Sequence, residues 1–137
     1  MNNKWLILLL TLLCGNAQAF QPSIEIIEQF DDVKLVAFIN ESDLKDYPLW
    51  QPLKEAPPLS IKSAIQAIQD QYAASHDVLI ANAVSEIELR KIDRHADYWH
   101  YLVKIKSDAS NNTKFQVYIV LMSGKVIPAL IETESYK

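Results

Sequence analysis

Apolar and polar residues alternate through the second half of the chain. Residues 86–90, 98–106 and 115–122 place apolar side chains at every second position. A period of two is typical of a strand with one face on a hydrophobic core. The links at 92–97 and 107–113 are polar and long enough for antiparallel hairpins. These segments therefore predict a meander of antiparallel strands.

A further strand is expected near the end of the chain. Ser123 and Gly124 predict a tight turn into an apolar segment that runs from Lys125 to about Ile131. Pro128 lies inside this segment. Because proline lacks the backbone donor that an inner strand uses, this strand should occupy a sheet edge.

Between residues 60 and 74 the period becomes that of a helix. Apolar residues recur at steps of three and four along one stripe, which contains Ile61, Ala64, Ile65, Ile68 and Tyr72. Ser60 stands at the N-cap position, where its hydroxyl can accept from an otherwise unpaired backbone N–H. Pro58 blocks extension of the helix upstream. The pattern predicts an amphipathic helix with one face on a sheet.

Upstream of the helix the pattern is less regular. β-Branched and aromatic residues predict a strand at about 33–39, and they leave residues 23–30 open between strand and helix. Four prolines in residues 47–59 favour an extended conformation there. Trp50 should pin this extended stretch to the body of the protein.

Together these elements predict an α+β fold for residues 20–137. An extended or strand segment at 20–58 precedes a helix and β-meander at 59–137. One main amphipathic helix, packed on a curved antiparallel sheet of about four strands, would bury the apolar faces of both.

Residues 1–19 have the pattern of a secretory signal peptide. Lys4 precedes an apolar run at 5–13, and Ala17-Gln18-Ala19 supplies small residues for cleavage. The apolar run is shorter than the roughly 20 residues that span a bilayer. We expect cleavage after Ala19 and a periplasmic or secreted domain.

Composition narrows the function classes. The chain has a formal net charge of −4, whereas nucleic acids and anionic lipid surfaces select cationic partners. Its one cysteine, Cys14, lies in the expected signal peptide, so no disulfide or thiol nucleophile is expected after cleavage. Beyond that segment Gly124 is the only glycine, which disfavours a phosphate-binding loop.

Residues 59 to about 129 resemble the PepSY domain of small secreted bacterial proteins. The resemblance is carried by four stretches of sequence: Leu59–Ile65, Ile87–Leu89, Tyr98–Val103 and Val117–Ile127. It implies a binding or protease-restraining module and not a catalyst. The cystatin-like fold is a similar helix-on-sheet arrangement and would also imply inhibition. PepSY domains often carry an acidic residue before the turn glycine, where this chain has Ser123.

One face of the predicted sheet is a candidate binding surface. The alternation assigns six residues to the face opposite the core: Tyr98, His100, Leu102, Tyr118, Val120 and Met122. This face is unusually apolar for one turned to solvent, which is typical of a partner surface. The alternative is that residues 20–53 fold back and cover it, with Trp50 as the plug.

Candidate chemistry is concentrated in one predicted hairpin loop. Asp93, His95 and Asp97 alternate, so an extended chain would direct all three toward one side, where they are weak candidates for metal ligands. The simpler interpretation is a polar loop that faces water, and no cofactor is expected. His76 and Asp77 could form a general-base pair, or they could lie at the end of the helix and interact with its dipole.

The sequence favours a non-catalytic binding or protease-inhibitory module. It would act on another protein, such as a peptidase, through an apolar sheet face or an edge strand. The alternative is a small-ligand carrier with a pocket between helix and sheet, lined by Trp99 and Tyr101. An enzyme or a metal-binding protein is the third hypothesis. No nucleic-acid partner is expected, and no membrane partner after signal cleavage.

Overall fold

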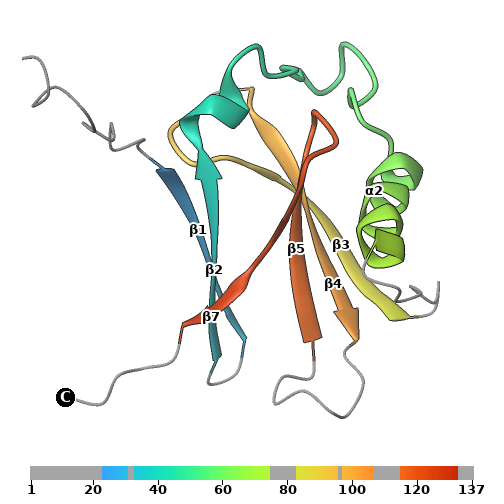
Figure 1. Ribbon diagram of the computed structural model, residues 1–137. Coiled ribbons are helices and arrows are strands. Elements are labelled where there is room, and N and C mark those ends of the chain that lie inside the picture. Colours follow the sequence, from blue (N-terminus) through green and yellow to red (C-terminus); the bar gives the residue numbers. More distant parts are fainter. Residues whose placement is uncertain (1–22, 31–32, 75–82, 96, 107–114, 133–137) are drawn as a thin grey trace, which may run out of the picture.

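The computed structural model describes residues 23–30, 33–74, 83–95, 97–106 and 115–132 (Figure 1). These residues form two antiparallel sheets and one main helix, so the predicted α+β class is confirmed. The elements, in chain order, are β1 (Ser23–Phe30), β2 (Val33–Asn40), the short 3-10 helix η2 (Glu41–Leu44), α2 (Ile61–Ala74), β3 (Val84–Lys91), β4 (Trp99–Lys106), β5 (Phe115–Leu121), β6 (Val126–Pro128) and β7 (Leu130–Glu132).

The two sheets are joined by one extended segment at the end of the chain. β3, β4, β5 and β6 form the four-stranded sheet, and β1, β2 and β7 form the three-stranded sheet. Ala129 alone separates β6 from β7, and its N–H donates to the carbonyl oxygen of Val117 at 2.9 Å. The single strand expected here is therefore divided between two sheets. Pro128 lies on β6, at a sheet edge, as predicted.

Helix α2 covers one face of the four-stranded sheet. Ala64 and Ile68, from the predicted stripe, are fully buried. The Tyr101 hydroxyl donates to the carbonyl oxygen of Leu59 at 2.7 Å, which fixes the entry to the helix above the sheet. Ile61 is 53% exposed, so the first member of the stripe lies outside the contact.

The predicted N-cap is confirmed. The Ser60 hydroxyl accepts from the backbone N–H of Ser63 at 3.1 Å. This bond satisfies one of the donors that the first turn of a helix leaves unpaired.

The three-stranded sheet covers the opposite face. β2 contributes Leu35, Ala37 and Ile39 to the same core cluster that contains Leu102 and Ile119 of the four-stranded sheet. Figure 1 shows α2 on one side of β3, β4 and β5, and the β1–β2 hairpin on the other. The result is a three-layer arrangement, in which the central sheet is buried on both faces. The segment 23–30, left open by the sequence, is a strand.

The turn between β5 and β6 requires a positive φ at Gly124. Its φ is +90°, and its N–H donates to the carbonyl oxygen of Leu121 at 2.8 Å. A Cβ at this position would meet no atom within 4 Å, so backbone strain alone should decide the effect of a substitution. We expect Gly124→Ala to lower the free energy of unfolding by about 1 kcal/mol in urea denaturation. Gly124→Asn, which tolerates this region better, should lose less. Equal stability of the alanine variant and the parent would contradict the conclusion that the turn requires a positive φ at residue 124.

Candidate functional site

The six residues predicted to share one sheet face lie on two faces. Residues that are directly opposed in an antiparallel pair point to the same side. His100 is opposed to Leu121 and Leu102 to Ile119, so these four share the face that the three-stranded sheet covers. The expectation of a single face is wrong, because alternation within each strand does not fix the register between strands.

Two other members of the set, Tyr118 and Val120, belong to the helix side. Tyr118 is opposed to Val103, and Val120 is opposed to Tyr101. The Tyr118 ring packs against Tyr72 of α2, with ring centroids 5.9 Å apart. The structure therefore separates Tyr118 and Val120 from His100 and Leu102 by the thickness of the sheet.

Because most of these six residues are buried, they do not form a surface that is open to a partner. Five of the six are buried, and these are His100, Leu102, Tyr118, Val120 and Met122. Tyr98 is half-buried and stacks on Tyr47 with ring centroids 5.2 Å apart. The alternative, in which residues 20–53 fold back over the sheet, holds for the face with His100 and Leu102, which β2 covers, whereas α2 covers Tyr118 and Val120. A partner could reach these residues only by displacing a layer of the protein.

In the N-terminal segment that was expected to cover the sheet, the aromatic residue that is buried is not Trp50 but Tyr47. Its side chain is 6% exposed, and its hydroxyl accepts from the Met122 N–H at 2.7 Å and donates to the Trp99 carbonyl oxygen at 2.6 Å. Trp99 and Met122 are the next positions after the His100–Leu121 pair, so the phenol connects β4 and β5 where their ladder ends. Burial raises the pKa of Tyr47 to about 12, although the Met122 N–H opposes this shift.

His100 is a buried base without a hydrogen-bond partner. The side chain is 2% exposed, and neither Nδ1 nor Nε2 has a partner among the described residues. Burial, and to a lesser extent the positive charge of Arg90, lower the pKa of His100 to about 4, although the negative charge of Asp93 opposes them. The imidazole is therefore neutral at pH 7.

The candidate metal ligands do not converge. Arg94 and Asp97 have φ values of 63° and 62°, so this segment turns and is not the extended chain that would align the three side chains. The Asp97 carboxylate accepts from Gln51 Nε2 at 3.2 Å, and the His95 ring lies 5.5 Å from the Tyr98 ring. Within the described ranges, no three side chains of His, Cys, Asp or Glu are grouped as a metal site. His76 and Asp77 lie outside the described residues.

The structure shows an exposed apolar surface that was not among the sites predicted from the sequence. On the outer face of the three-stranded sheet, Ile27, Val36 and Leu130 form one row across β1, β2 and β7. Phe38 lies two residues further along β2. Ile27 is 51% exposed, Phe38 43% and Leu130 59%, whereas Val36 forms a floor at 7%. We call these four residues the outer patch.

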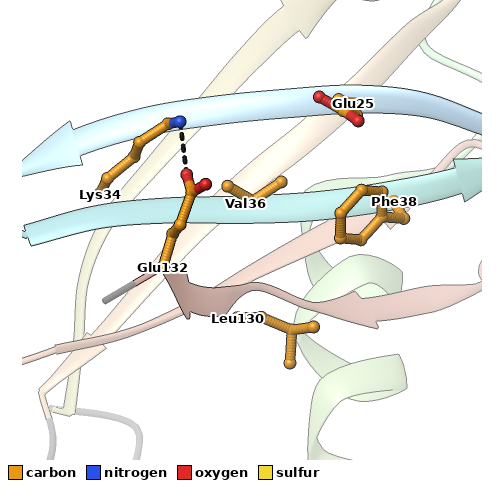
Figure 2. Close-up of a pocket in the computed structure, with 6 residues that line it drawn as sticks. All are labelled: Glu25, Lys34, Val36, Phe38, Leu130 and Glu132. Atoms are coloured by element: carbon orange, nitrogen blue, oxygen red, sulfur yellow. Dashed lines mark ion pairs between the residues drawn. The ribbon is translucent and has the colours of Figure 1, made fainter. Parts of the chain in front are cut away.

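Charged groups border the outer patch. The six residues drawn in Figure 2 line an open hollow of about 260 Å³. Phe38 and Glu25 lie toward one end of this group, and the ion pair of Lys34 with Glu132 lies toward the other. Glu25 is opposed to Phe38 in the register and is exposed. Val36 is buried although it is outside the core cluster. The surface thus combines apolar area with a charged border, an arrangement that suits binding.

Comparison with known proteins gives no relative. The chain matches no protein-family model, no curated protein and no solved structure. The resemblance to PepSY and cystatin-like domains therefore stays a prediction. No helix of the described segments is long and apolar enough to cross a bilayer.

Proposed function

We propose that this protein is a non-catalytic binding module of the periplasm or the exterior of the cell, and that it holds another protein at the outer patch and the adjacent strand β1. The observation that carries the proposal is the exposure of Ile27, Phe38 and Leu130 on one sheet face. Apolar side chains scattered singly over a surface are ordinary, but a contiguous group bordered by charges is typical of a partner site.

The rest of the sheet surface supports this location. The helix covers one face of the central sheet, and the three-stranded sheet covers the other. The outer patch lies on the one remaining sheet face of this three-layer arrangement. A protease-inhibitory form of the proposal would place a segment of the peptidase on the same surface.

A small-ligand carrier has less support. It would need a pocket between α2 and the central sheet, where Ala64 and Ile68 are fully buried and Tyr101 is 2% exposed. The hollow lined by Val36, Phe38 and their neighbours is open and lies on a different face. A pocket for a small apolar ligand is usually enclosed and several hundred Å³ in volume.

The proposal is tested by placing a charge in the outer patch. Phe38→Asp should weaken binding of a partner purified from the periplasm at least tenfold, because a buried anchor at an interface typically contributes more than about 1.4 kcal/mol. Leu53→Asp is the matched control, since Leu53 is 105% exposed on the segment before α2 and outside the patch. Affinity is measured by calorimetry with both purified proteins. A partner that binds Phe38→Asp as tightly as the parent would show that the patch is not the site.

A further inference from the structure

We propose that the partner presents an extended segment with basic and apolar residues, which pairs with the free edge of β1 as an added strand. This inference rests on the proposed function, and it names the chemistry of the segment. Strand addition derives affinity from backbone hydrogen bonds and specificity from the side chains on either side of the new strand.

The first step is that β1 has an open edge. All eight of its residues, Ser23 to Phe30, are in register with β2 on one side. In the described part of the chain, no strand pairs with the other side. An edge strand presents unpaired N–H and C=O groups, which are a template for another strand.

The second step is that the other three sheet edges are protected. β3 carries four charged residues, Glu86, Glu88, Arg90 and Lys91, and a register shift lies between Val84 and Glu86. β6 is three residues long and contains a proline, and β7 is also three residues long. Short strands, charges, irregular register and proline are the devices that prevent edge pairing. β1 has no bulge in its pairing and contains no lysine, arginine, proline or glycine.

The third step is the charge of β1. Its only charged residues are Glu25 and Glu28. The nearest base on the outer face of β2, Lys34, is already paired with Glu132 of β7. Across an antiparallel pair, opposite charges stabilise and like charges destabilise, so a strand beside β1 should carry Lys or Arg opposite these two positions.

The remaining positions define the apolar part of the segment. Ile24 and Ile26 pack against the core cluster, and Ile27 belongs to the outer patch. A residue opposite Ile27 would extend the apolar row of the patch, and residues opposite Ile24 and Ile26 would extend the core side. Read from its own N-terminus, an antiparallel partner therefore has the pattern basic, apolar, apolar, basic, apolar. A second copy of β1 lacks the two bases, which argues against self-pairing.

The test uses two capped heptapeptides as probes, Thr-Lys-Val-Val-Lys-Val-Thr and the same peptide with glutamate in place of lysine. Binding to the purified protein is measured by NMR titration at low ionic strength, together with amide exchange of β1. We expect the basic peptide to bind at least tenfold more tightly than the acidic one and to slow exchange in β1. Glu25→Lys should reduce this preference or reverse it. Glu55→Lys, the same charge change at an exposed position on the segment before α2, should leave it unchanged.

Three results would overturn the inference. These are equal affinity for the two peptides, binding without protection of β1, and a preference that survives Glu25→Lys. Protection of β1 in the free protein that rises with protein concentration would assign the edge to a second copy. Failure of both peptides while Phe38→Asp still abolishes partner binding would reject strand addition and leave the proposed function standing. Peptide binding at β1, together with a partner that binds Phe38→Asp as tightly as the parent, would leave strand addition standing and reject the outer patch as the partner site.

Discussion

Lowering the pH from 7 to about 4 should cost the folded protein about 3 kcal/mol through His100 alone. The pKa of this histidine is about 4 in the folded state, against an ordinary value of 6.5. Between these values the unfolded chain binds the proton and the folded chain does not, so stability falls as the pH falls. The stability that the neutral His100 contributes is fully present above about pH 6.5. At pH values well below the folded-state pKa, this histidine causes no further loss of stability. The cause is that protonation would place a cation between two sheets, beside Arg90 and without a hydrogen-bond acceptor.

The measurement is the free energy of unfolding in urea as a function of pH. Carboxylates also titrate in this range, so the informative quantity is the difference between the parent and His100→Leu, which has a similar volume and no proton to bind. This difference should change by about 3 kcal/mol between pH 7 and 4 in favour of the variant. His95→Gln is the matched control, because it removes a half-buried histidine without altering the core. Parallel curves for the parent and His100→Leu would show that the imidazole is accessible to protons in the folded state.

Removing one oxygen from Tyr47 should lower the free energy of unfolding by about 2–4 kcal/mol. Tyr47→Phe keeps the ring that stacks on Tyr98, but it leaves the Met122 N–H and the Trp99 carbonyl without the phenol that serves both. The cost of an unpaired buried polar group is larger than the net gain from an ordinary hydrogen bond, and here two groups are affected. The loss should appear in urea denaturation at pH 7, where the tyrosine is protonated.

The control for this variant is Tyr98→Phe. It removes a hydroxyl that makes no described hydrogen bond, while it retains the stacked pair, and it should stay within about 0.5 kcal/mol of the parent. A parent-like stability of Tyr47→Phe would mean that β4 and β5 close together and join Trp99 directly to Met122. The Tyr47 hydroxyl would then not be required to connect β4 and β5 at the end of their hydrogen-bond ladder.

Local features of the sequence were sufficient for the main helix and for most of the strands. Ser60 and the apolar stripe through Ile68 located the helix, because capping and a period near 3.6 act within a few residues. The strands from Trp99 and Phe115 followed from alternation for the same reason. Ile61 was the exception, since an apolar residue in the first turn is buried only if the sheet extends beneath it.

Features that depend on pairing between distant segments were not predictable in this way. The polar link between β4 and β5 does not specify that His100 is opposed to Leu121, so the faces of the two strands were combined incorrectly. The outer patch depends on the pairing of β2 with β7, whose partners are more than ninety residues apart in the sequence. One signal for it was present in the sequence. Val36 and Phe38 alternate with Leu35 and Ala37, and a strand that is apolar on both sides has two faces to cover.

The segment through Ala129 has a consequence for the order of folding. β2 is synthesised well before β7, yet Val36 pairs with Leu130. The central sheet also lacks its final strand until the residues just before β7 are available. Loops of this length close slowly, and neither sheet is complete in a nascent chain. We therefore expect neither sheet to reach its final form until β7 has been synthesised.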